Sequence, residues 1–154
     1  MRYSVRFSDA IHILAYIEMF QGTDLSSEMI AKSIETNPAN VRKLMSYLRN
    51  SQLILTQNGK AKPTLARKPE EITLFDIYRS IEGESNLIQV DEKTNPACIV
   101  GGNIQKVLQA KYDDLQAAVE AEMKKITLAE IIHDISVDEV AQRPENFQTV
   151  SRFL

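Results

Sequence analysis

Three apolar stripes at helical spacing fill the first fifty residues of the chain, with short polar breaks between them. The first stripe predicts a helix over residues 8–20, which Gly22 ends. The second predicts a shorter helix over residues 26–36, with Ser26 or Ser27 as its N-cap. Two consecutive amphipathic helices joined by a short break indicate a helical domain whose core they share.

A third helix is expected to begin at Asn37-Pro38. Asparagine is a strong N-cap, and proline at the first helical position gives up a backbone N–H that had no partner there. The apolar face of this helix consists of Val41, Leu44, Met45 and Leu48. The positions that point elsewhere are Asn40, Arg42, Lys43, Ser46, Tyr47 and Arg49. The helix is therefore expected to lie on a core while it presents amide and basic groups outward.

A small β-hairpin is expected to follow the three helices. Residues 53–56 form a short apolar run with strand propensity, and Asn58-Gly59 is a strong turn signal. The return strand is predicted over residues 63–66, at an edge because of Pro63. Three helices and a hairpin are the outline of a winged helix domain, so the predicted fold is mainly α with a small two-stranded wing.

Two further helix starts carry the same local pattern. Thr73 is the expected N-cap of a helix that stops at Gly83, with Asp76 three positions after the cap and Ile72 packed on Ile77. The pattern recurs at residues 126–131, which predicts a short last helix to about residue 134. Residues 84–94 are read as a loop with a candidate strand over 87–90.

The longest helix is expected to start at Asn95-Pro96. Its apolar stripe consists of Ile104, Leu108, Tyr112, Leu115, Val119, Met123 and Ile126. Its polar face consists of Gln105, Lys106, Gln109, Asp113, Asp114, Gln116, Glu120 and Lys124. Pairing with a second copy would bury the stripe and is favoured, and folding back on the same chain is the alternative. The predicted division is a DNA-binding domain over 1–83, a loop and dimerisation helices over 84–134, and a tail over 135–154 with no assigned role.

The charge of the chain is unevenly distributed. The net charge of −3 combines +5 in residues 1–68 with −8 in residues 69–154. A basic half favours a polyanionic partner, although chance segregation of solvated charges gives the same count. No apolar run is long enough to cross a membrane, and the N-terminal residues lack the apolar stretch of a signal peptide. A cytoplasmic protein with no membrane partner is expected.

The helical pair over residues 25–48 has the features of a helix-turn-helix, in which the second helix enters the major groove of double-stranded DNA. Asn40 is expected to read adenine edges, and Arg42 and Lys43 to reach guanine or phosphate. The candidate DNA-binding residues are Ser26, Ser27, Asn37, Asn40, Arg42, Lys43, Tyr47, Arg49, Lys60 and Lys62.

Several segments resemble the Rrf2 family of bacterial winged helix-turn-helix transcription regulators. They are SSEMIAKSIETNPANVRKLMSYLRNSQLI, LARKPEEITLFDIYRSIEG, CIVGGNIQKVL and KITLAEII, and NPANVRK is the most specific piece. The resemblance covers nearly all of residues 1–134 and is greatest to a cluster-less, YwnA-like branch. It implies a homodimer with a crossed long helix that binds a roughly palindromic operator, most often as a repressor. The wing departs from the glycine-rich tip that many members have.

Cysteine usage bears on cofactors and on sensing. Cluster-binding members of the family carry three cysteines before the long helix, whereas this chain has only Cys98, so no iron–sulfur cluster and no metal site is expected. His12 is expected to have a satisfied ring, and His133 to lie on the surface near a helix C-terminus. Cys98 is a candidate redox sensor if it lies in the first turn of the long helix, and a buried interface residue is the equal alternative.

Two other classes of function compete with a regulator. A helical adaptor that docks a protein partner would use the long stripe without DNA. An enzyme is not expected, because the sequence has no glycine-rich phosphate loop, no Ser/His/Asp set and no metal-ligand cluster. The paired acids of the long helix, Asp113-Asp114 and Glu120/Glu122, are interpreted as solvated surface. A small-molecule effector remains open, with no candidate from the sequence.

Overall fold

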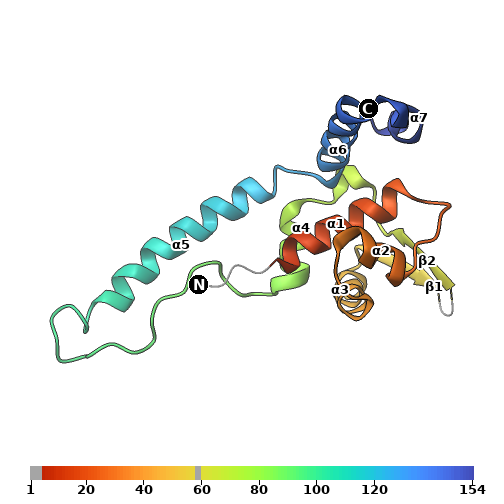
Figure 1. The fold of residues 1–154 in the computed structure, drawn as a ribbon. Helices are drawn as coiled ribbons and strands as arrows, with labels where there is room; N and C mark the ends of the chain where they lie inside the picture. Colours follow the sequence, from red (N-terminus) through yellow and green to blue (C-terminus); the bar gives the residue numbers. More distant parts are fainter. Residues whose placement is uncertain (1–4, 58–59) are drawn as a thin grey trace.

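The computed structural model describes residues 5–57 and 60–154, which form a helical body with one long helix extending from it (Figure 1). The helices of the body are α1 (Arg6–Met19), α2 (Ser27–Ile34), α3 (Pro38–Asn50) and α4 (Leu74–Glu82). The hairpin consists of β1 (Ile54–Gln57) and β2 (Lys60–Leu65). The second half contributes α5 (Ile104–Met123), α6 (Leu128–Gln142) and α7 (Phe147–Val150), with short 3-10 turns at Pro69–Glu71, Pro144–Asn146 and Ser151–Phe153.

Helix α1 lies at the centre of the core. Its side chains Ala10, Ile13, Leu14 and Ile17 are completely buried. They pack in one cluster with residues of the other body helices and of α6, including Ile30, Val41, Leu44, Leu48, Ile77 and Leu128. The apolar stripes of the first three helices therefore face one shared core, and the predicted winged helix architecture is confirmed.

The starts of α2 and α4 agree with their local sequence. The Ser26 side chain accepts a hydrogen bond from the backbone of Met29 at the start of α2. Thr73 and Asp76 form a reciprocal capping box at the start of α4, as predicted. Ile72 and Ile77, the expected hydrophobic pair, are both fully buried.

The hairpin is antiparallel and pairs Ile54 with Leu65 and Leu55 with Thr64, with an irregularity between Leu55 and Gln57. Its second strand starts at Lys60, three residues earlier than predicted, so Pro63 lies inside the strand. A two-stranded sheet has only edges, which is why proline is tolerated there. The predicted Asn58-Gly59 turn lies outside the described residues.

The starts of α4 and α6 lie side by side. Thr73 and Thr127 form an isolated antiparallel bridge. The backbone N–H of Leu74 donates to the carbonyl of Ile126, and that of Leu128 donates to the carbonyl of Ile72. The two similar sequence patterns therefore form one joint, which fixes the end of the long helix to the core.

The long helix begins eight residues later than predicted, at Ile104 rather than at Pro96. The prediction that Asn95-Pro96 starts it is wrong, because residues 96–103 form turns instead. A Cβ at Gly102 would lie 2.7 Å from the carbonyl oxygen of Pro96 and 3.0 Å from that of Cys98. This close backbone approach needs glycine, and the glycine pair delays the helix.

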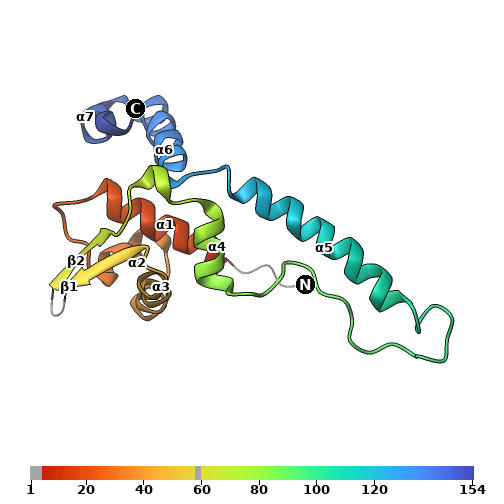
Figure 2. The same ribbon diagram turned by 180° about the vertical axis from the view of Figure 1, so that it is seen from behind.

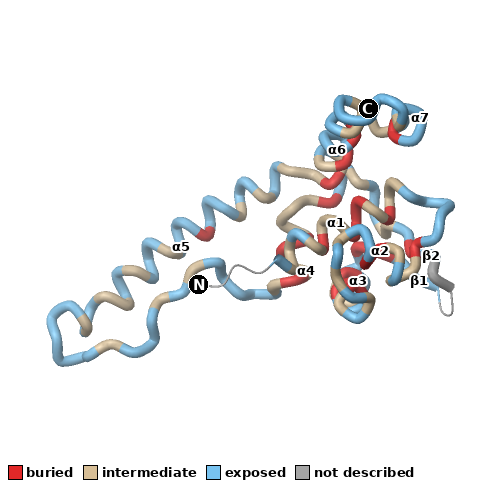
Figure 3. The backbone as a smooth tube through the Cα atoms, in the orientation of Figure 1, coloured by how far each residue is buried: buried red, intermediate tan, exposed pale blue. Residues whose placement is uncertain are grey.

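An extended segment runs outward from α4 to the start of α5, and α5 leads back toward the body (Figure 1). The candidate strand over residues 87–90 is absent, since the described residues 83–103 contain neither helix nor strand. Figures 1 and 2 show that this segment and α5 project from the body, and Figure 3 shows that most of α5 is exposed or half-buried. None of the described helices combines the length and apolarity that a membrane span needs.

The C-terminal residues are helical and fold back on the body. The prediction that the last helix ends near residue 134 is wrong, because α6 continues to Gln142 and is followed by α7. The Arg152 guanidinium donates to the carbonyl of Glu18 on α1. His133 is exposed, as predicted, but lies in the middle of α6, where its ring contacts the carbonyl oxygen of Phe153. The tail is thus a packed part of the structure.

Candidate nucleic-acid interface

Helix α3 is capped as the sequence predicts. The Asn37 side chain accepts a hydrogen bond of 2.7 Å from the backbone N–H of Asn40, and Pro38 occupies the first turn. Beneath the helix, Val41, Leu44 and Leu48 are at most 1% exposed. Because this face is fixed to the core, the other face of α3 is held at a defined orientation at the surface.

The basic residues of α3 lie on that outer face. Arg42, Lys43 and Arg49 are all exposed. Arg42 lies 3.7 Å from Glu28 of α2, and the two side chains are 59% and 66% exposed. An ion pair this exposed and this long contributes little. The Arg42 guanidinium can therefore leave Glu28 for another acceptor at small cost.

Asn40 and Tyr47 are more restrained than the sequence suggests. The Asn40 amide nitrogen donates to Thr36 at 3.2 Å, and the residue is half-buried. Reading an adenine edge takes both the nitrogen and the oxygen of an amide, so Asn40 would have to release Thr36. Tyr47 is half-buried, and the guanidinium carbon of Arg6 lies 5.2 Å from the centre of its ring. This position suits packing between helices.

The remaining candidates surround α3. Ser26 and Ser27 stand at the start of α2, and both are half-buried. Lys62 of β2 is exposed, whereas the side chain of Lys60 lies outside the described part of the chain. In Figures 1 and 2, α3 and the hairpin lie at the lower end of the body and α6 and α7 at the upper end. The predicted reading helix and wing thus share one end of the molecule.

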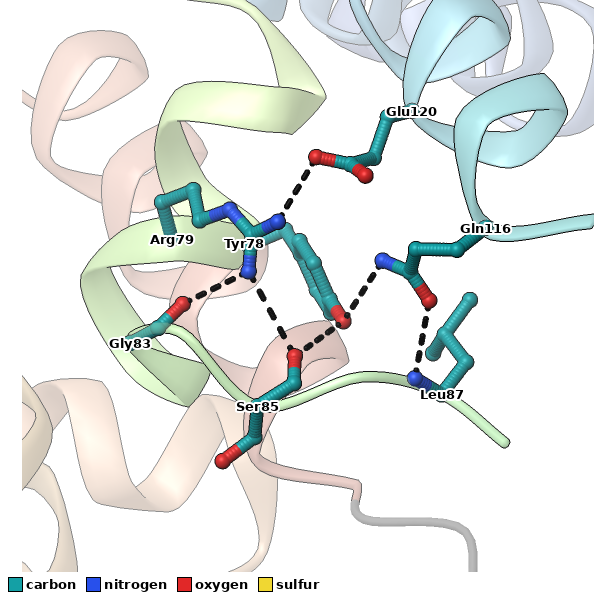
Figure 4. A network of polar contacts seen from close by, with 7 residues as sticks. All are labelled: Tyr78, Arg79, Gly83, Ser85, Leu87, Gln116 and Glu120. Atoms are coloured by element: carbon teal, nitrogen blue, oxygen red, sulfur yellow. Dashed lines mark hydrogen bonds and ion pairs between the residues drawn. The ribbon is translucent and has the colours of Figure 1, made fainter. Parts of the chain in front are cut away.

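A polar network joins α4 to α5 (Figure 4). The buried Tyr78 hydroxyl donates to the carbonyl of Ser85 at 2.8 Å and accepts from the Gln116 amide at 3.4 Å. The Gln116 carbonyl oxygen accepts from the backbone N–H of Leu87 at 3.0 Å. Arg79 and Glu120 form an ion pair of 2.7 Å with side chains 23% and 20% exposed. We call these contacts the α4–α5 network.

The network corrects the prediction for the polar face of α5. Gln116 and Glu120 were expected in solvent, but Gln116 is buried and Glu120 half-buried against α4. Periodicity alone missed them because polar side chains with mutual partners can pack as well as apolar ones. The other acids of the predicted face, Asp113 and Asp114, are exposed, and so is Glu122, which was interpreted as solvated surface.

The apolar stripe of α5 remains largely uncovered within one chain. Leu115 is 51% exposed and Val119 is 37% exposed. The other predicted positions, Ile104, Leu108, Tyr112 and Met123, are half-buried. Val107, which the sequence analysis did not include, is 53% exposed. The alternative in which the stripe folds back on its own domain is therefore not what the structure shows.

Cys98 lies in the turns before α5 and is exposed. The expectation that it occupies the first helical turn is wrong, since the helix begins six residues later. The pKa of its thiol is nevertheless lowered, because the backbone N–H groups of Gly101 and Val100 donate to the sulfur. The stabilisation of a thiolate thus comes from the turn.

The two histidines and the metal-binding candidates can be placed as well. His12 is a residue of α1 whose ring nitrogen lies 2.7 Å from the Ser33 hydroxyl, as expected for a satisfied ring. Within the described residues, no three His, Cys, Asp or Glu side chains gather as a group that could hold a metal ion. One exposed cysteine does not supply the donor set of an iron–sulfur cluster.

Comparison with known proteins agrees with this geometry. The family model of Rrf2, described as an iron-dependent transcriptional regulator, matches residues 3–134. A candidate HTH-type transcriptional regulator of Bacillus subtilis, YwnA, is 35% identical over 130 residues, which cover 84% of this chain and 96% of YwnA.

Solved structures of other proteins have a similar fold. A candidate DNA-binding protein of known crystal structure has a TM-score of 0.68 and 33% identity, and the match covers 82% of this chain and 98% of that protein. A candidate transcriptional regulator from Lactobacillus plantarum shares the fold, with a TM-score of 0.74 and 18% identity over 92% of this chain and 97% of its own. Sequence, fold and the exposed basic face of α3 agree, and the chain belongs to the Rrf2 family of transcriptional regulators.

Proposed function

We propose that the protein represses transcription as a homodimer in the cytoplasm, with α3 of each copy in the major groove of a palindromic operator. The observation that carries this proposal is the exposed pair Arg42 and Lys43 above a fully buried apolar stripe on a helix that starts at an Asn-Pro cap. A rigid helix with guanidinium and ammonium groups near its start suits base edges and phosphates. Catalysis has no part in this role.

The uncovered stripe of α5 supports the homodimer. Gln116 and Glu120 already hold α5 against α4 through the α4–α5 network, whereas the exposed side chains of Leu115, Val119 and Val107 have no apolar surface over them. A second copy offers the same stripe, and two-fold pairing would present two reading helices to two half-sites.

A salt series tests DNA binding. We expect the protein to shift the promoter upstream of its own coding region in a gel, and to lose affinity by about a hundredfold or more as salt rises from low to physiological levels. Steep weakening is expected because several phosphates release counterions when the basic residues bind. No shift at any salt would favour the alternative of a helical adaptor that binds a protein. Tight binding that does not change with salt would contradict recognition through phosphate contacts.

The proposed regulator works without an iron–sulfur cluster, although the family description mentions iron. Its single exposed thiol and the donor groups around it do not fit such a cluster. A small molecule is instead proposed as the effector, and oxidation of Cys98 is proposed as a second input. The exposed position and lowered pKa of this thiol support its reaction with oxidants.

The role of Cys98 can be measured directly. After mild treatment with diamide, the wild type is expected to lose operator affinity as its thiols are oxidised to a disulfide between two protomers, while diamide is reduced to the hydrazine. Cys98→Ser cannot form this disulfide and should keep its affinity. A non-reducing gel checks the cross-link. Equal loss of affinity in both proteins would show that Cys98 is not a sensor.

A further inference from the structure

A groove runs between α1 and the C-terminal helices, on the face where the tail folds back. Its volume is about 700 Å³, which lies in the range of small-molecule sites. Ile11 and Tyr16 of α1 line the groove, as do Ile135 and Glu139 of α6 and Thr149 of α7. We call it the α1–α6 groove. It lies in part on residues past 134, where the match to the family model ends.

The apolar lining of the groove is not closed over by the chain itself. Phe20 is 38% exposed and Ile135 is 43% exposed, although both lie close to a core whose residues are completely buried. The Tyr16 and Phe20 rings lie against each other, with centroids 4.6 Å apart. Two neighbouring aromatic rings beside an aliphatic wall offer a flat apolar molecule a large contact area.

The two charged side chains of the groove, Glu139 and Arg143, are paired with each other. Glu139 forms an ion pair of 2.7 Å with Arg143 and accepts a hydrogen bond of 2.6 Å from Asn146. These contacts lower the pKa of Glu139, so the carboxylate keeps its charge next to its cation. Burial lowers the pKa of His12, so its ring is neutral at pH 7. The lining therefore has no unpaired charge with which to attract an ion.

The groove also contains an uncharged polar pair that a ligand can reach. The His12 ring and the Ser33 hydroxyl lie 2.7 Å apart in the lining, and both types of group donate and accept hydrogen bonds. A hydroxyl or carbonyl of a ligand can join this pair without the desolvation cost of a charge. Ser33 belongs to α2, so the polar end of the groove touches the first helix of the helix-turn-helix.

We infer that the α1–α6 groove binds a small uncharged molecule that has an apolar ring or chain and one hydroxyl or carbonyl group near His12 and Ser33. This names a site and a chemical class for the effector, and only the consequence for transcription depends on the proposed function. Binding itself involves no DNA and is tested without it.

Isothermal titration of the full-length protein with three matched probes tests the inference. Naphthol carries a neutral hydroxyl, naphthoate a negative charge and naphthylmethylamine a positive charge on the same ring system. We expect saturable binding of naphthol, and binding of the two ions weaker by about tenfold or more because their charges find no unpaired partner. No binding of naphthol, or tighter binding of either ion, would overturn the inference.

A matched pair of variants places the ligand. Ile135 and Val137 are neighbours on α6 and are 43% and 45% exposed, but only Ile135 lines the groove. Ile135→Glu is expected to weaken naphthol binding at least about tenfold, and Val137→Glu to leave it unchanged. Thr149→Trp, at an exposed position, fills the groove with a ring and should also abolish binding. Equal naphthol affinity in wild type, Ile135→Glu and Thr149→Trp would show that the groove is not the site.

The operator gel shift then separates the two proposals. If naphthol binds in the groove and changes operator affinity in the wild type but not in Thr149→Trp, both stand. If naphthol binds and no DNA is shifted under any condition, the groove stands and the regulator does not. If the operator is shifted while naphthol fails to bind, as when a second copy covers the groove, only the regulator stands.

Discussion

Replacing Arg42 by alanine is expected to lower the preference of the protein for its operator over unrelated DNA by roughly tenfold to a hundredfold. The guanidinium lies on the outer face of α3, where the long, exposed pair with Glu28 restrains it little. A bidentate contact from arginine to a guanine edge contributes about 1–3 kcal/mol of discrimination. Competition gel shifts with operator and scrambled duplexes at fixed salt measure the ratio.

Arg49 provides the matched control for this experiment. It is also exposed on α3 but lies at the C-terminal end of the helix, away from the residues that would reach base edges. Arg49→Ala and Lys62→Ala are expected to weaken binding to both duplexes by similar factors, as the loss of a phosphate contact does. If Arg42→Ala leaves the ratio of operator affinity to scrambled-duplex affinity at its wild-type value, Arg42 of α3 does not contact base edges as proposed.

The double substitution Leu115→Glu and Val119→Glu is expected to convert the dimer to a monomer and to reduce operator affinity by about a hundredfold or more. Two carboxylates in the uncovered stripe would have to be buried without partners in the interface. A monomer binds one half-site at a time and loses the gain from linking two reading helices. Light scattering should give a mass of 17.4 kDa for the variant and twice that for the wild type.

Ala117→Glu is the control for this variant. Ala117 is exposed on the same helix, about half a turn away from Leu115, so its face is not the stripe. This variant adds a negative charge to α5 but is expected to remain a dimer with unchanged operator affinity. A dimeric mass for the Leu115→Glu and Val119→Glu protein would contradict the assignment of the interface.

The first half of the fold could be predicted from the sequence because its signals are local. Asn37-Pro38 and the Thr73-Asp76 pair fix helix starts through contacts within one turn. The apolar stripe of α3 faces a core that the neighbouring helices also reach. The candidate DNA-binding residues follow from the same helix geometry, and their roles remain predictions.

The second half depends on contacts between distant residues, which no local pattern reveals. Asn95-Pro96 has the same two residues as the start of α3. Here, however, the backbone of Gly102 packs against Pro96, and the helix begins only at Ile104. Gln116 is buried because Tyr78 and Leu87, far away in the sequence, satisfy its amide. The groove beside α1 arises only when the tail folds back, so its lining could not be found from spacing.

The α4–α5 network has a consequence for how operator architecture evolves. Helix α5, which meets the other copy in the proposed dimer, is about 30 Å long. The α4–α5 network attaches it to the DNA-binding body by a few polar contacts near one end of the helix. A change of about 10° in the angle between α4 and α5 displaces the far end of α5 by about 5 Å. This displacement is larger than the rise of one base pair, which is roughly 3.4 Å. In the proposed dimer, substitutions at Arg79, Gln116 or Glu120 would therefore change the preferred spacing between the two half-sites. The base sequence recognised in each half-site would stay the same.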